Sequence, residues 1–354
     1  MSTLMVALAS LGGVVLAGVV AHGAWQARRA GPKRATPAVR EEPTASASGP
    51  GGEPALVGEP PPLADDNEPG LAVARRPSRR MPLQLDALID AFAPIALEAP
   101  ILGETVLAHL PSKRHVGSKL VLVEGLNVAT GHWEAPAAGE RYAELQAGVQ
   151  LASRTGALNE IEYSEFVQRM QEFADAIGAG IDPPDMLEVM AQARELDAFA
   201  SQHDAQLAVH LHARGAAWSI GYVQQHARRH GFVPGVVPGR LVYPSTEEGA
   251  PPVLTLTFDS QAALADEPDR AAVRDVTLSF DVPQTDPAAE PFKAWQAAAQ
   301  ALAVGMDAAI VDDNGQPLSS DGFAMIGNEL AALYEALQAH DLAAGSAAAR
   351  RLFS

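Results

Sequence analysis

The sequence predicts an α+β protein: a transmembrane helix, a disordered Pro-rich linker, and an antiparallel sheet with helices on one face. Three observations carry this prediction. The first 27 residues hold no charged side chain, and residues 26–80 are rich in Pro, Ala, Gly, Ser and Glu. Later segments alternate apolar and polar residues or repeat apolar residues at helical spacing. The folded part therefore begins near residue 83 and has split β-α-β patterning.

Residues 3–25 form the predicted transmembrane helix. At about 1.5 Å per residue this run spans roughly 33 Å, enough for a bilayer core of about 30 Å. Four basic residues follow within residues 28–34. Lys and Arg mark the cytoplasmic end of a span, so we expect the N-terminus outside the inner membrane, in the periplasm, and the rest in the cytoplasm. The alternative, a cleaved signal peptide, needs basic residues before the apolar run, and residues 1–4 have none.

Residues 26–80 form the predicted disordered linker. Runs such as EEPTASASGPGGEP cannot bury enough apolar surface to offset the entropy lost on ordering. A flexible chain of this length has an r.m.s. end-to-end distance of about 40 Å. The linker therefore gives the folded part a long reach from the membrane.

Charge and cysteine content exclude several classes of function. The formal net charge is −18, while residues 1–40 hold five basic and no acidic residues, so the rest of the chain is more acidic still. This argues against a nucleic-acid partner, whose phosphates need clustered Lys and Arg. The chain has no cysteine, which excludes disulfides, thiolate catalysis and cysteine-bound metals.

Residues 83–200 form a first predicted α+β block. Residues 85–99 favour a strand or short helix, and residues 119–127 and 141–153 favour strands. Apolar residues at helical spacing predict two helices, over 164–177, with Ser164 as its cap, and over 185–199.

One strand of this block is apolar on both faces. Leu120 and Leu122 lie opposite Val121 and Val123. Such a strand suits either a groove above one face or burial within the protein on both sides.

Residues 205–345 form a second block. Alternation predicts strands over 205–214, 239–244, 252–259 and 273–283, and an apolar run followed by a turn predicts another over 309–313. Helices are predicted from Trp218 to a stop at Gly231, from Phe292 to residue 308, and from Ser320 to His340.

The two blocks share a pattern. The segment EFVQRMQEFADAIGAGI, with Phe166, and the segment AWQAAAQALAVGMDAAI, with Trp295, have similar apolar spacing. We interpret this as a divergent internal duplication, with convergence of two α+β layers as the alternative.

Three short motifs follow one another in residues 205–345. A predicted strand ends in Val282–Pro283, Phe292–Lys293 opens the next predicted helix, and Val311, Asp312 and Asp313 precede the last turn. Together with the anchor and the Pro-rich linker, this order of motifs resembles the ZipA family of bacterial cell-division proteins, whose terminal domain has a similar Val-Pro, Phe-Lys and Val-Asp-Asp at these places.

The resemblance implies a six-stranded antiparallel sheet with helices on one face, whose other face binds the C-terminal tail of the tubulin-like protein FtsZ. The chain would then be a divisome component, not an enzyme, that tethers and stabilises the FtsZ ring at the division septum. Its partner would be the FtsZ C-terminal peptide, with no cofactor and no small-molecule substrate.

Strand alternation assigns residues to the two faces of this sheet. The helix-packed face is predicted to hold Leu207, Val209, Leu211, Leu241, Tyr243, Leu254, Leu256, Phe258, Val276, Leu278 and Phe280. The predicted partner-binding face holds Ala208, His210, Arg240, Val242, Thr255, Thr257, Thr277 and Ser279. The family's groove is apolar with large Met, Ile and Phe side chains, whereas this face is mostly polar. The alternatives are a solvated outer face or a groove in the block at 83–200.

Other chemistry has little support in the sequence. His210 and His212, and also His226 and His230, have spacings that occur in metal sites, but the two pairs are predicted on opposite sides of a strand, so we expect no metal site. Asp312 and Asp313 precede Asn-Gly, which is typical of a turn. The chain lacks a nucleophile elbow, a Walker A loop and a dinucleotide fingerprint. The remaining alternatives are an adaptor for another cytoplasmic partner and a membrane-tethered enzyme.

Overall fold

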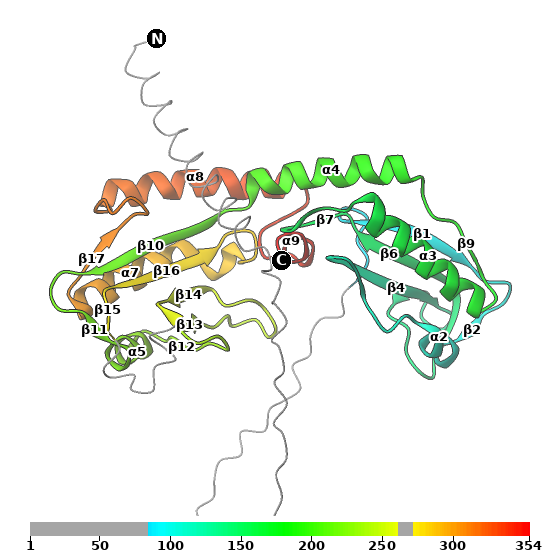
Figure 1. Cartoon of the computed structure of the whole chain (residues 1–354), viewed down its shortest axis with the longest axis horizontal. Helices are drawn as coiled ribbons and strands as arrows, with labels where there is room; N and C mark the ends of the chain where they lie inside the picture. The colour runs from blue at the N-terminus through cyan, green and yellow to red at the C-terminus, as the bar shows by residue number, and fades with distance from the viewer. Residues whose placement is uncertain (1–83, 261–271) are drawn as a thin grey trace, which may run out of the picture. The chain divides into compact units, whose positions relative to one another are not determined.

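The computed structural model describes residues 84–260 and 272–354. The predicted transmembrane helix at 3–25 and the predicted linker at 26–80 lie outside the described residues. Within the described part, no helix is both long and apolar enough to cross a membrane. Residues Arg79–Ser354 group into one unit, so both predicted blocks belong to it (Figure 1).

The first block contains an antiparallel sheet with the strand order β4-β6-β1-β9 at its centre. The alternating segments predicted as strands form β4 and β6, and the ambiguous segment at 85–99 contributes strand β1. The main strands are β1 (Asp90–Ala96), β4 (Lys119–Asn127), β6 (Arg141–Gln150) and β9 (Gly180–Ile181). Short strands are β2 (Ile101–Leu102), β3 (His115–Val116), β5 (Trp133–Glu134), β7 (Ala152–Ser153) and β8 (Gly156–Ala157).

Three helices belong to this block: α2 (Gly103–His109), α3 (Glu160–Ala176) and α4 (Met186–His203). Helix α3 packs on one face of the sheet, where its Phe166 and Met170 are fully buried. The prediction that Ser164 caps this helix is wrong. The cap is Asn159, whose side chain accepts the N–H of Glu162 while Glu162 bonds back to the Asn159 N–H, a capping box that starts the helix one turn earlier.

The second block contains a six-stranded, entirely antiparallel sheet in the order β12-β13-β14-β16-β10-β17. This is the sheet that the family resemblance implies. Its strands are β10 (Gln206–Ala213), β12 (Val233–Pro234), β13 (Arg240–Tyr243), β14 (Leu254–Thr257), β16 (Asp275–Asp281) and β17 (Ala308–Val311). A separate pair consists of β11 (Trp218–Ser219) and β15 (Ala272–Val273).

Helix α7 covers one face of this second sheet (Figure 1) and contacts β10, β14, β16 and β17. Its Trp295 is fully buried and donates its indole N–H to the Leu278 carbonyl at 2.9 Å, which fixes the helix on the central strand. The helices are α5 (Ile220–Arg229), α7 (Pro291–Met306), α8 (Ser320–Ala339) and α9 (Ala347–Leu352), with a 3₁₀ turn at Pro287–Ala289. Helix α5 ends just before Gly231, whose φ of 84° suits the predicted glycine stop.

Seven elements of each block follow the same order along the chain, and their strands follow the same order in the sheet, when the other strands of each block are left aside. The chain order is β1, α2, β4, β6, α3, β9, α4 in the first and β10, α5, β14, β16, α7, β17, α8 in the second. The corresponding sheet orders are β4-β6-β1-β9 and β14-β16-β10-β17. The residues aligned by the sequence pattern have matching roles, because Phe166 and Trp295 are both fully buried beneath their sheets.

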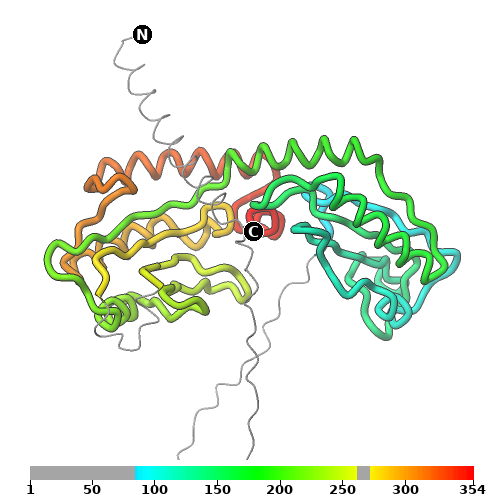
Figure 2. Tube along the Cα trace, viewed as in Figure 1, coloured from blue at the N-terminus to red at the C-terminus, as the bar shows by residue number. Residues whose placement is uncertain are grey.

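The blocks meet through the ends of the chain. A third apolar cluster joins Ile89 and Ala152 of the first block to Leu337, Leu352 and Phe353 of the C-terminal region. Figure 2 shows the chain returning at its C-terminus to the neighbourhood of β7, which α9 contacts. The C-terminal helix therefore completes the packing around the start of the first sheet.

Candidate functional site

The face of the second sheet opposite α7 holds all eight residues predicted for partner binding. Antiparallel pairing aligns them in two rows across four strands. One row is Ala208, Ser279, Thr255 and Val242, and the other is His210, Thr277, Thr257 and Arg240. The rows lie next to each other because consecutive residues on one face of a strand are two positions apart.

The residues of the other face lie in the core, as predicted. Val209, Leu211, Leu256 and Leu278 are at most 1 % exposed. Leu207 and Phe258 are only partly buried against this core, and Tyr243 at the sheet edge is 37 % exposed and packs its ring against Phe232.

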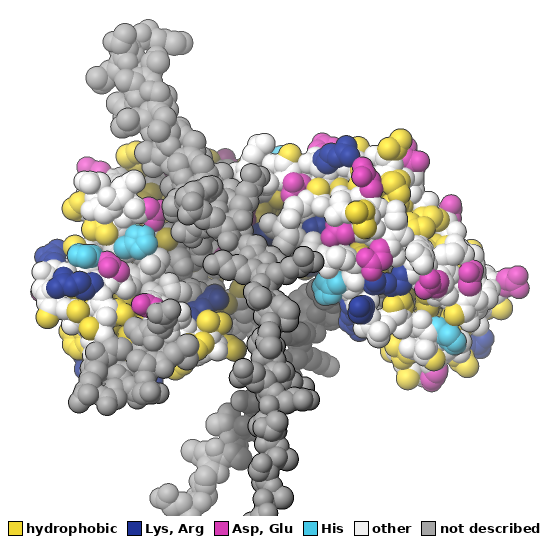
Figure 3. Space-filling model, in the orientation of Figure 1, with side chains coloured by type: hydrophobic (Ala, Val, Ile, Leu, Met, Phe, Trp, Pro, Cys, Tyr) yellow, Lys and Arg dark blue, Asp and Glu magenta, His cyan; other side chains and the backbone are white. Residues whose placement is uncertain are grey.

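Histidines and carboxylates meet at one end of the uncovered face. The His210 ring contacts the Thr277 hydroxyl at 3.0 Å through Nδ1 and the Asp313 carboxylate at 2.9 Å through Nε2. His212 contacts Asp275 at 2.6 Å. Figure 3 shows histidine and acidic side chains together at the surface over β10 and its neighbours. This end of the face therefore has paired, polar groups with both rings held by hydrogen bonds.

The middle of the face is made of small and hydroxyl side chains. The Arg240 guanidinium donates to the Thr255 hydroxyl at 3.2 Å, which holds the arginine across the strands. Ala208, Val242 and the threonine methyl groups provide the apolar part of the surface. The result is a shallow face with hydroxyl groups, one guanidinium and a few methyl groups.

Strand pairing adds residues that the sequence analysis did not assign to this face. Val311 and Ala309 of β17 stand opposite His210 and His212, and Val233 of β12 stands opposite Val242. The alternation of residues 309–313 could have indicated this, but the neighbour of β17 in the sheet is set by tertiary structure. These residues extend the apolar part of the face to both edges.

The histidine pairs do not assemble a metal site. His226 lies on α5 against the Tyr222 ring, with centroids 4.4 Å apart, whereas His210 and His212 have their carboxylate partners on the uncovered face. Burial, assisted by Arg229 and His230, lowers the pKa of His226. Within residues 84–260 and 272–354, no three His, Asp or Glu side chains are grouped so that they could hold a metal ion.

Asp312 and Asp313 have different roles. The Asp312 carboxylate accepts the N–H groups of Asn314 and Gln316, and Gly315 has a φ of 75°. This confirms the predicted turn. Asp313 instead faces His210.

The most enzyme-like cluster surrounds Lys119 in the first block. Its ammonium group donates to the Ser118, Ser153 and Thr155 hydroxyls and to the Gly156 carbonyl, at 2.7–3.2 Å. Burial lowers the pKa of Lys119, and the charge of Glu162 opposes that shift. Because four acceptors surround three ammonium hydrogens, the lysine holds the β7–β8 hairpin to β4 rather than presenting a free base to a substrate.

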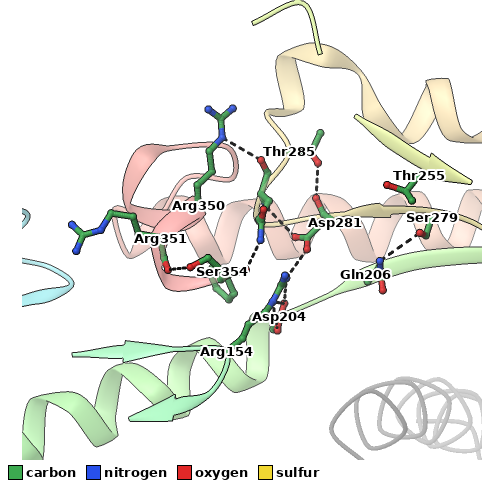
Figure 4. A network of polar contacts seen from close by, with 12 residues as sticks. Arg154, Asp204, Gln206, Thr255, Ser279, Asp281, Thr285, Arg350, Arg351 and Ser354 are labelled. Carbon is green, nitrogen blue, oxygen red and sulfur yellow. Dashed lines mark hydrogen bonds and ion pairs between the residues drawn. The ribbon is translucent and has the colours of Figure 1, made fainter. Parts of the chain in front are cut away.

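A polar network borders the candidate face where β16 ends. Arg154 of the first block pairs with Asp204, after α4, at 2.6 Å and with Asp281 of β16 at 2.7 Å (Figure 4). Burial raises the pKa of Asp281, and the nearby Arg154 charge and hydrogen bond offset part of that rise. One guanidinium therefore links the two blocks beside the connection between them.

No model of a known protein family matches the chain, and no curated protein matches it.

Proposed function

We propose that the chain is a membrane-anchored adaptor of the ZipA type, whose second sheet binds the C-terminal tail of FtsZ on its uncovered face. The proposed role is to tether and stabilise the FtsZ ring at the cytoplasmic face of the inner membrane. The observation that carries the proposal is the arrangement of the second sheet, with six antiparallel strands, helix α7 on one face and two aligned rows of predicted binding residues on the other.

The positions of the resembling motifs support this proposal. Strand β16 ends at Asp281, and the next two residues are Val282, which is fully buried, and Pro283. Phe292 and Lys293 lie in the first turn of α7, and Val311 ends β17 before the Asp312 turn. The motifs therefore lie at the strand ends and helix start that the family pattern implies.

We infer further that the two blocks are divergent copies of one ancestral unit. The identical order of seven elements and the matching buried positions of Phe166 and Trp295 support this. The faces opposite the two cores differ: that of the second block is polar, and that of the first holds Phe92, Leu122 and Leu126. A duplicated fold of this kind lets one copy keep partner binding while the other changes.

The chemistry of the face suits a peptide with short apolar side chains and at least one acidic group. Methyl groups of Ala208, Val242 and Thr255 offer a shallow apolar surface, and Arg240 offers a donor fork for a carboxylate. A surface with so little large apolar area predicts modest affinity and a dependence on salt, because charged contacts at an exposed face are screened.

The test is a titration of the unit Arg79–Ser354 with a fluorescent peptide of the FtsZ C-terminal tail. Saturable binding is expected for the wild type, and at least a tenfold weaker affinity for Thr255→Lys, which places a long charged side chain in the middle of the face. Thr246→Lys is the matched control, since Thr246 lies exposed in the loop between β13 and β14. No saturable binding to the wild type would contradict the proposal, and equal binding by both variants would move the site away from this face.

A second experiment separates the proposal from the adaptor and enzyme alternatives. A fluorescent fusion of the full chain is expected to form a midcell ring that disappears when FtsZ is depleted. A uniform membrane signal that does not change on depletion would favour another cytoplasmic partner or a tethered enzyme.

A further inference from the structure

The face of the first sheet opposite its apolar core has a hollow between its central strands. Gly148 lies on the central strand β6, between Leu122 of β4 and Phe92 of β1 in the pairing register. All three positions lie on the face opposite the core, which contains the alternate residues Val121, Val149 and Ala91 of those strands. Because Gly148 has no side chain, the strands themselves place no side chain in the middle of this row.

The side chain of Leu85 fills this hollow. A Cβ atom at position 148 would lie 2.3 Å from Leu85 Cδ2, closer than two non-bonded carbon atoms can approach. The chain reaches this place by a turn after Leu85. The Asp86 carboxylate accepts the Leu88 N–H at 2.9 Å, and the Asp90 carboxylate accepts the Asp86 N–H at 2.8 Å. We call residues 84–88 the strap, since they fold back over the sheet that follows them.

A buried carboxylate on the same face binds the strap's backbone. Glu124, 3 % exposed, accepts the Leu85 N–H through Oε1 at 2.8 Å and the Gln146 side-chain amide through Oε2 at 2.9 Å. An ionised carboxylate has acceptors only, and burying it without donors is costly. The face therefore has two features that can bind a peptide. One is the hollow over Gly148, which takes an aliphatic side chain, and the other is the Glu124 carboxylate, which accepts a main-chain N–H.

The C-terminal helix holds the other side of the strap. The Arg351 guanidinium donates to the Gln84 carbonyl at 2.9 Å while it pairs with the buried Asp90. The strap's backbone is thus bound at a donor on one side and an acceptor on the other. Main-chain recognition together with a side-chain pocket is the physical basis of extended-peptide binding.

We propose that this face of the first sheet is a peptide-binding groove that the chain fills with its own strap, and that it accepts a peptide of the same kind in trans. The ligand is an extended segment with an aliphatic side chain over Gly148 and a main-chain N–H on Glu124. The predicted linker at 26–80 lies shortly before the strap in the sequence, so a competing peptide that displaces the strap also releases the N-terminal end of the described fold. This proposal does not depend on FtsZ binding by the second sheet.

The test uses the unit Arg79–Ser354 and a fluorescent peptide of residues 79–89, RRMPLQLDALI. The wild type is expected to bind the peptide at least tenfold more weakly than Leu85→Asp, whose charged side chain leaves the hollow. Adding Gly148→Val to Leu85→Asp places a side chain in the hollow and is expected to abolish the stronger peptide binding of Leu85→Asp. The same peptide with Asp in place of its Leu85 is expected not to bind any variant.

Leu187→Asp serves as the matched control, because Leu187 lies exposed on α4, 78 % accessible to solvent, and the same charge there leaves the strap seated. Its peptide binding should equal that of the wild type. Circular dichroism melts establish that each variant is folded, and Leu85→Ala replaces Leu85→Asp if the charged variant does not fold. The proposal is overturned if the opened variant does not bind the peptide, or binds it equally with and without Gly148→Val.

Discussion

The guanidinium of Arg351 lies 2.6 Å from the carboxylate of Asp90, and both side chains are nearly fully buried, at 8 % and 1 % exposure. The two residues are 261 positions apart. Gln150 of β6 adds a hydrogen bond to the Arg351 carbonyl at 2.9 Å. This ion pair joins the last helix of the chain to the first strand of the first sheet, so the C-terminus is part of the packing of the first block.

Arg351→Ala is expected to lower the free energy of unfolding by about 3–5 kcal/mol, because it leaves the Asp90 carboxylate buried without its charged partner. Urea denaturation of the unit Arg79–Ser354 measures this loss. Arg350→Ala is the matched control. Its pair with Glu247 is more exposed, at 22 % and 48 %, and exposed pairs contribute about 0–1 kcal/mol. Equal losses for the two variants would show that the buried pair has no special role.

The pH dependence of stability should reflect Asp281. Burial raises its pKa above the ordinary 3.8, so in the folded state Asp281 holds its proton to a higher pH than in the unfolded state. Its contribution to stability is therefore fully present below the unfolded pKa and is lost as pH rises through the folded pKa. Comparing urea midpoints of the wild type and Asp281→Asn between pH 3.5 and 7 should show this loss in the wild type alone.

Glu247 is expected to change stability with pH in the direction opposite to Asp281. The hydrogen bond from Arg350 lowers the pKa of Glu247 below 4.5, so its contribution is present at neutral pH and is lost as pH falls through the folded pKa. Glu247→Gln should remove that acid-side loss. If both variants shift the pH profile in the same direction, the assignment of the two carboxylates is wrong.

Gly125→Ala is expected to destabilise the first sheet by about 1–3 kcal/mol through overpacking. A Cβ at Gly125 would lie 2.4 Å from the buried Tyr142 ring. That ring is held through its hydroxyl group, which accepts the Ala137 N–H and donates to the Glu134 carboxylate. Gly180→Ala is the control, since a Cβ at Gly180 meets no atom within 4 Å. Thermal melts should separate the two variants, and similar melting temperatures would mean that Tyr142 moves aside freely.

Local periodicity was sufficient for most elements and for the faces of the second sheet. The strand predicted over residues 119–127 coincides with β4 (Lys119–Asn127), and the final helix predicted from Ser320 to His340 matches α8 to within one residue. Alternation also placed Thr255, Thr277 and their neighbours on one face, because antiparallel pairing keeps the side-chain parity of each strand.

Features that depend on distant contacts were not predicted. The segment at 85–99 indicates a strand or a short helix, but its first residues turn back at Asp86, and their place over Gly148 depends on the sheet that forms later in the chain. Helices α2 and α9 were not predicted either. Helix α9 has six residues, too few for an apolar period, and is defined by the Ser346 cap and the buried Arg351.

The last prediction concerns two tyrosines whose hydroxyl groups have opposite hydrogen-bond states. The Tyr334 hydroxyl finds no partner among the described residues, and burial raises the pKa of Tyr334 to about 12. Tyr334→Phe removes this unpaired group and is expected to raise the free energy of unfolding by up to about 2 kcal/mol. Tyr163→Phe should lower it by about 1 kcal/mol, since the Tyr163 hydroxyl donates to the Pro184 carbonyl. Urea denaturation of both variants tests the contrast, and a loss of stability in Tyr334→Phe would reveal a partner for its hydroxyl.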